Sequence, residues 1–135
     1  MWQRVGVRAS LVAVLLAGCA TTAVPPPTGP MWAFFTDSDL RLGPGAVVYT
    51  TSQASCEAER LRRALAPVTC VPVIVSRGTG YHAIALPSQL NASLPGGGIG
   101  TLERDRCDRL RMDLFRAFSA KGDCQPVSVT LVPPS

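Results

Sequence analysis

The chain has 135 residues, of which 47% are hydrophobic, 16% charged and 6% aromatic, and this length allows one small domain. Twelve glycines and twelve prolines exclude a long coiled coil, and the apolar content excludes an acidic or low-complexity disordered chain. Arg4 and Arg8 carry two units of the net charge of +4, so a chain that has lost its first residues carries +2, which is no sign of a nucleic-acid partner.

The N-terminus has the regions of a secretory signal in their usual order. Met1–Arg8 contains two arginines and no acidic residue, and Ala9–Ala17 is an apolar run. A run of about nine residues is too short for a membrane-spanning helix, which needs about 20. Cys19 follows directly after the small residues Ala17 and Gly18. We therefore expect this segment to direct export and to be removed.

The sequence Leu16-Ala17-Gly18-Cys19 resembles the lipobox of bacterial lipoproteins. The resemblance implies that residues 1–18 are a lipoprotein signal peptide, that Cys19 becomes the first residue, and that its thiol and amine are acylated. The residue after the cysteine is Ala20 rather than an aspartate, which resembles the pattern of lipoproteins that are sent to the outer membrane. The expected location is the cell envelope, with a lipid anchor in the outer membrane and the domain facing the periplasm. The alternative is a general signal peptidase that cuts after Ala23.

Residues 19–30 are predicted to form a lipidated, proline-rich tether. Residues 20–30 read ATTAVPPPTGP, which offers little to bury and favours an extended polyproline conformation. At about 3.1 Å per residue this spacer reaches roughly 34 Å. The folded domain is accordingly expected to cover residues 31–135.

Periodicity and turn signals predict the elements of that domain. Helices are predicted from Ser52 to the residue before Pro67 and over Thr101–Ala120. The expected apolar face is Ala54, Ala58, Leu61 and Leu65 for the first helix and Cys107, Leu110, Leu114 and Phe118 for the second. Pro87–Gly100 is predicted to be a loop, and Ser76–Gly80 a hairpin turn. The predicted strands are Met31–Phe35, Ala46–Thr50, Val71–Val75, Tyr81–Leu86 and Val127–Val132.

These elements indicate a single small α+β domain in which two helices pack on a four- to five-stranded antiparallel sheet. Without Met31–Phe35 the order is βαββαβ, the split pattern of ferredoxin-like folds. A weak repeat, in which a cysteine, a helix and Cys-x-Pro-Val occur twice, agrees with that order. The alternative is a looser meander in which Met31–Phe35 pairs with Ala46–Thr50.

The four cysteines after Cys19 are Cys56, Cys70, Cys107 and Cys124. A small exported domain commonly stabilises itself with disulfides, and four thiols allow three pairings. In a ferredoxin-like sheet the last strand lies beside the first, which favours Cys56–Cys124 and Cys70–Cys107. Pairing of sequence neighbours, Cys56–Cys70 and Cys107–Cys124, remains open. No Cys-x-x-Cys is present and His82 has no zinc-finger spacing, so we expect no metal site and no cofactor.

Two further motifs have structural and functional interpretations. His82, the only histidine, shares a strand face with Ile84 and Leu86 and is interpreted as structural. Pro95–Gly100 precedes a helix, but no Gly-Lys-Ser/Thr follows it, so a loop is favoured over a phosphate site. A strand that contains Trp32 and a helix that contains Cys56-Glu57-Ala58 resemble features of small exported bacterial domains. This resemblance implies no activity.

The sequence thus favours a membrane-anchored, non-catalytic binding or scaffolding module. Its expected partners are the lipid bilayer, through acylated Cys19, and an envelope protein or glycan, with no nucleic acid. Docking is expected on an open sheet face that includes Ser128 and Thr130, with Val127, Val129 and Leu131 turned to the helices. The alternative is a small periplasmic hydrolase or modifying enzyme that uses His82 with a serine or aspartate partner.

Overall fold

The computed structural model describes residues 24–36, 45–63, 67–88, 94–118 and 122–133. Cys19 and the signal segment lie outside these residues, so cleavage and acylation remain predictions. Leu65 also lies outside them, as do the side chains of Leu114 and Phe118.

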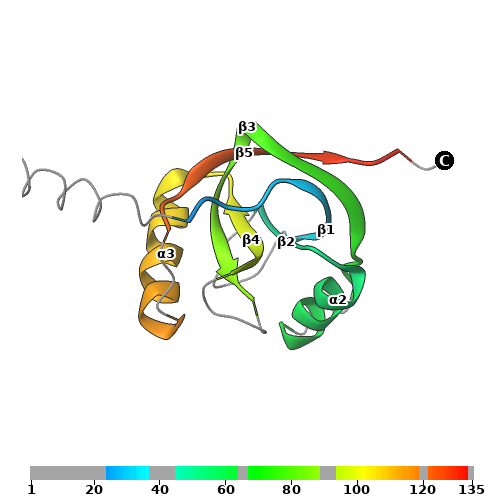
Figure 1. Cartoon of the computed structure of the whole chain (residues 1–135), viewed down its shortest axis with the longest axis horizontal. Coiled ribbons are helices and arrows are strands. Elements are labelled where there is room, and N and C mark those ends of the chain that lie inside the picture. The colour runs from blue at the N-terminus through cyan, green and yellow to red at the C-terminus, as the bar shows by residue number, and fades with distance from the viewer. Residues whose placement is uncertain (1–23, 37–44, 64–66, 89–93, 119–121, 134–135) are drawn as a thin grey trace, which may run out of the picture.

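The described chain forms five strands and two helices: β1 (Gly29–Thr36), β2 (Ala46–Thr50), α2 (Gln53–Arg62), β3 (Val71–Pro87), β4 (Pro95–Thr101), α3 (Arg104–Phe118) and β5 (Gln125–Leu131). All strand pairs are antiparallel (Figure 1). The α+β class, the two helices and the antiparallel five-stranded sheet are confirmed. So is the pairing of the first two strands, which the alternative meander predicted.

The sheet closes on itself, which the ferredoxin-like prediction did not foresee. β1 pairs with β2 along one edge and with the first part of β3 along the other, where Met31 lies opposite Val73. β4 joins β2 to the second part of β3, where Ile84 lies opposite Ile99. Strands β1, β2, β4 and β3 therefore form a small barrel, and β5 pairs with β3 outside it. The ferredoxin-like prediction is wrong because β1, which the split pattern omits, is the strand that closes the barrel.

β3 is one long strand where the sequence predicted a hairpin. Arg77 and Tyr81 both lie opposite Val127 of β5, so residues 78–80 form a bulge rather than a turn. Gly80 has a φ of 123°, a conformation open mainly to glycine. A bulge of this kind bends a strand without ending it. Because of this bend, the first part of β3 pairs with β1 and the second part pairs with β4.

Alternation along the strands builds two separate apolar cores. The first fills the barrel, and its buried members are Met31, Ala33, Val47, Tyr49, Val73, Val75, Ala83 and Val127. The second lies on the outer surface of the barrel, and its buried members are Phe34, Ala46, Val48, Cys56, Cys70 and Ile99. Because Cys56 belongs to α2 and the half-buried Leu110 belongs to α3, both helices contribute to the outer core.

The glycine-rich segment is strand β4, which corrects the predicted loop over Pro87–Gly100. A Cβ added at Gly98 would lie 2.3 Å from Cζ of Tyr49, and one added at Gly100 would lie 3.1 Å from Cγ1 of Val47. These glycines face the barrel interior, where the Tyr49 ring occupies the space that side chains on β4 would need. A narrow barrel with a large aromatic ring inside leaves room only for glycine on the facing strand.

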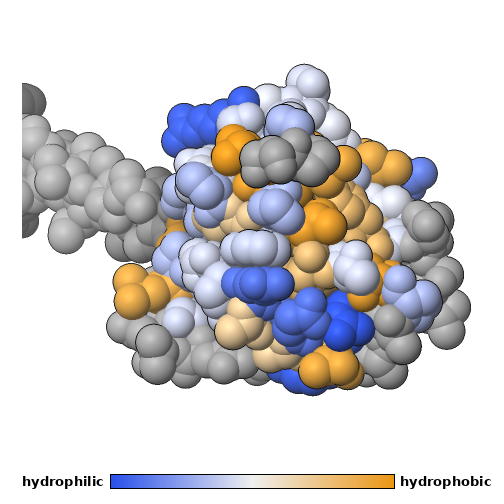
Figure 2. Space-filling view, turned by 90° about the vertical axis from the view of Figure 1, so that its right-hand side faces the viewer, coloured by the Kyte–Doolittle hydropathy of each residue, from blue (hydrophilic) through white to orange (hydrophobic). Residues whose placement is uncertain are grey.

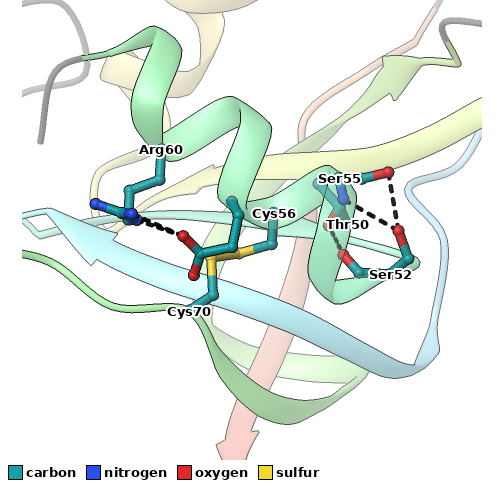
Figure 3. The surroundings of a disulfide bond; sticks show 7 residues. Thr50, Ser52, Ser55, Cys56, Arg60 and Cys70 are labelled. Carbon is teal, nitrogen blue, oxygen red and sulfur yellow. Dashed lines mark hydrogen bonds and ion pairs between the residues drawn. A yellow bond between two sulfur atoms is a disulfide. The ribbon is translucent and has the colours of Figure 1, made fainter.

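Helix α2 begins at a regular N-cap, because the Ser52 hydroxyl accepts a hydrogen bond from the Ser55 N–H at 3.1 Å. Its predicted apolar face is wrong: Ala54 and Ala58 are exposed, and Leu61 is 66% exposed. The helix instead turns Cys56 toward the barrel (Figure 3). Its charged side chains pair along the helix surface, as in Arg60–Glu57 at 2.7 Å and Arg62–Glu59 at 2.6 Å.

The segment before β1 lies against the domain. Pro26 is buried, and a Cβ added at Gly122 would lie 3.0 Å from the carbonyl oxygen of Val24. β1 also begins at Gly29, two residues before the predicted domain boundary. The second half of the predicted tether thus contacts the folded domain, with Pro26 as its buried residue. Neither described helix has the length and apolar character that crossing a membrane requires.

Candidate functional site

The four cysteines form two disulfides, Cys56–Cys70 and Cys107–Cys124. The preferred pairs Cys56–Cys124 and Cys70–Cys107 are wrong, because they assumed the strand order of an open ferredoxin-like sheet. The observed Cα–Cα distances are 6.2 Å and 6.1 Å, since each helix is followed by a segment that returns along it. Two disulfides are typical of a protein that folds in an oxidising compartment outside the cytoplasm.

His82 is half-buried on β3, with Thr101 of β4 opposite it on one side and Pro126 of β5 on the other. The Thr101 hydroxyl donates its hydrogen bond to the Glu103 carbonyl oxygen at 2.7 Å. In the described part of the chain, His82 has no hydrogen bond or ion pair to an acidic or hydroxyl side chain. Among the described residues, His82 is therefore not paired with a serine or aspartate partner of the kind that the hydrolase alternative requires.

The Tyr49 hydroxyl is a polar group inside the barrel. Tyr49 is fully buried, and its hydroxyl has no hydrogen-bond partner among the described residues. Burial raises the pKa of the Tyr49 phenol far above its ordinary value, because the phenolate would be placed in an apolar interior. The same cause raises the pKa of the less buried Tyr81. The interior is therefore a packed core with a neutral phenol inside it.

Two surface grooves lie near the start of β5. One, of about 560 Å³, runs between α3 and the residues before β5, and the other, of about 320 Å³, lies beside the proline-rich segment. The first is lined by three arginines and two aspartates, and in it Arg111 Nη1 lies 3.4 Å from Asp123 Oδ1. Arg104 Nε lies 3.9 Å from Asp108 Oδ2. Opposite charges thus largely compensate one another, as expected for a solvated helix surface.

The outer side of β5 is an edge of the described sheet. Among the described strands β5 pairs only with β3, so one of its edges carries main-chain groups without a strand partner. The Val132 N–H donates to the Pro72 carbonyl oxygen at 3.2 Å. Since main-chain groups alternate in direction along a strand, Thr130 also directs its groups to β3. Val129 and Leu131 direct theirs away from β3.

We call Val129–Val132 the β5 edge. Leu131 is 60% exposed and Val132 40%, and Ile74 of β3, which lies opposite Thr130, is 41% exposed. Figure 2 views the side of the molecule toward which the C-terminal end of β5 points, and apolar residues appear there as separate small areas among polar ones. The β5 edge is therefore a short apolar strip that also offers main-chain donors and acceptors.

The predicted docking face on β5 is corrected by this arrangement. Val127 and Val129 do not face the helices: they contribute to the core inside the barrel. Ser128 is half-buried, and a Cβ added at Gly78 would lie 2.9 Å from its Cβ, so Thr130 is the exposed member of the predicted pair. One signal could have indicated the edge beforehand, because residues 125–135 contain no charged side chain.

Comparisons with protein-family models, with curated proteins and with solved structures found no match for this chain.

Proposed function

We propose that the protein is an exported, non-catalytic binding module, anchored in the envelope membrane by acylated Cys19 and facing the periplasm. Support for export comes from the signal-like N-terminus and from the two disulfides. Support for the anchor comes from Cys19 directly after Leu16-Ala17-Gly18, and Ala20 supports the outer membrane.

The observation that carries the binding function is the β5 edge. Its outward N–H and C=O groups can pair with an extended main chain, and the exposed Leu131 and Val132 can cover apolar side chains of that chain. Edge strands that must stay free are commonly protected by charged side chains, and this one has none. The β5 edge therefore favours a protein segment over a glycan as the partner.

Complementation of a deletion strain tests this proposal. Thr130→Arg places a charge on the β5 edge without disturbing a core, so it should abolish complementation while abundance and membrane fractionation stay normal. The matched variant His82→Ala should complement fully, because binding at the β5 edge needs no proton transfer. A His82→Ala strain that behaves like the deletion at normal abundance would contradict the proposal and favour the hydrolase alternative.

A further inference from the structure

The part of β5 that can accept another strand is short and sharply bounded. Val127 also directs its main chain away from β3, but it is only 1% exposed and so is unavailable to a partner. After Val132 comes Pro133, which has no N–H to donate. The available outward groups are those of Val129 and Leu131.

We propose that the β5 edge binds the β5 edge of a second copy of this chain, as an antiparallel pair related by a two-fold axis at Thr130. This inference rests on the proposed binding function and names its partner. In that register Val129 of each copy lies opposite Leu131 of the other, and each such pair exchanges two main-chain hydrogen bonds. The register uses every available outward group and requires none from Val127 or Pro133.

The side chains suit self-pairing. Because no residue from 125 to 135 is charged, two identical edges meet without repulsion between like charges. On one face of the joined sheet Leu131 of each copy lies beside Val129 of the other, which covers a side chain that is 60% exposed in the single chain. On the other face two threonines meet at the axis, flanked by Ile74 from each copy.

The symmetry limits the assembly and fits the anchor. A two-fold pairing occupies the β5 edge of both copies, so it stops at a dimer. Rotation about an axis preserves height along that axis, so both copies present Val24 at the same level, and both anchors can enter one bilayer. Confinement to a membrane also raises the effective concentration of each copy for the other.

Cysteine cross-linking in intact cells that express the full chain tests the register. Thr130→Cys places two thiols at a non-hydrogen-bonded pair, where Cα atoms are about 4.5 Å apart, within the range of a disulfide. Most of this variant should run as a covalent dimer on a non-reducing gel. The control is Val132→Cys, whose thiols would be separated by four residues along the strands, about 13 Å, and which should stay monomeric.

A second variant keeps the test independent of folding. Adding Leu131→Pro to Thr130→Cys removes an outward N–H that β3 does not use, so β5 should stay in place and the cross-link should disappear. Equal cross-linking of Thr130→Cys and Val132→Cys, or a ladder of higher oligomers, would overturn the proposal.

The two proposals fail separately. If Thr130→Cys does not cross-link and Thr130→Arg still abolishes complementation, self-pairing is overturned and binding of another protein at the β5 edge stands. If the cross-link forms and Thr130→Arg complements fully, the dimer exists and the proposed function is wrong.

Discussion

Tyr49 of β2 and Gly98 of β4 lie opposite each other in the barrel. The phenol ring stands where a side chain at Gly98 would be, and both residues are fully buried. Interiors of this density tolerate an added methyl group only if neighbours move, and the Tyr49 ring is enclosed on all sides.

Gly98→Ala should therefore destabilise the domain by about 1–3 kcal/mol, because its methyl group would overlap the Tyr49 ring. Gly100→Ala on the same strand is the matched control. Its methyl group would meet Val47 at 3.1 Å and Tyr81 at 3.2 Å, so a smaller loss is expected. Urea unfolding of the non-reduced domain measures both losses, and equal values would contradict the role assigned to Tyr49.

Burial of Tyr49 also makes stability depend on pH. Its pKa is higher in the folded state than the ordinary 10.0, so the folded protein holds the phenol proton more tightly than the unfolded chain does. The free energy of unfolding is therefore unaffected by the titration of this group below pH 10, and it decreases as the pH rises above 10.

Tyr49→Phe should leave stability at neutral pH nearly unchanged, because the hydroxyl has no partner among the described residues. Above pH 10 the variant should lose less stability than the wild type. Thermal unfolding as a function of pH measures the difference, with Tyr81→Phe as the control for a less buried phenol. Identical alkaline profiles for Tyr49→Phe and the wild type would disprove this linkage.

At the scale of the elements, α2 depends on its disulfide. Cys56 is the one buried residue of this helix, and its other interactions include partly exposed ion pairs such as Arg60–Glu57. Ion pairs of that kind stabilise a helix by only a few tenths of a kcal/mol. The disulfide to Cys70, the residue immediately before β3, joins the helix covalently to the barrel.

Replacing Cys56 and Cys70 together with alanine should cost about 3 kcal/mol, and amide exchange should accelerate first in Gln53–Arg62. Barrel amides should keep most of their protection, since the barrel strands pair with one another. Leu61→Ala, at an exposed position of the same helix, should change stability by less than about 0.5 kcal/mol. Equal acceleration in helix and barrel would show that α2 and the barrel unfold as one unit.

The sequence predicted those elements that local patterns determine. The existence of both helices and of β1, β2 and β5 was predicted from local sequence patterns and from the proline at position 67, although the predicted apolar face of α2 was wrong. The same local rules failed at Gly78 and Gly80, where turn residues produce a bulge, and in β4, where glycines signal a loop. In both places the outcome depends on distant partners, Val127 and Tyr49, which no local pattern identifies.

The site was predicted only in part for a related reason. Thr130 was correctly expected to be exposed, because strand alternation is a local property. The expected open four-stranded sheet is replaced by a barrel among the described strands, because barrel closure depends on pairings between distant parts of the chain. The same closure places β5 at the end of the sheet: β3 has β1 and β4 along one side and β5 along the other, and no described strand pairs with the second edge of β5.

For the whole molecule, the decisive prediction concerns processing. The mass of the intact membrane form should match a chain that begins at an acylated Cys19, and Cys19→Ala should move the protein to the soluble fraction. Pro26→Ala is a control that leaves the anchor in place. An unmodified chain that begins at Val24 would exclude the anchor.

Because residues 24–30 contact the domain, the distance that can separate the folded domain from the acylated Cys19 is shorter than the tether composition predicts. Only residues 20–23 separate Cys19 from Val24, so the domain would begin within about 18 Å of the acylated residue, about half the reach that the tether composition predicts. A partner of this domain would therefore meet it near the lipid headgroups.

The order of the disulfides bears on how the chain would fold during the export that we propose. A chain that crosses a membrane with its N-terminus first presents Cys56 and then Cys70 before Cys107 has emerged, and Cys107 and Cys124 follow. Each bridge joins neighbours among the four cysteines after Cys19, separated by 14 and by 17 residues. With the Cys19 thiol acylated, pairing in order of arrival gives the native bridges. Oxidation during translocation then needs no later exchange of disulfide partners, which the crossed arrangement would have required.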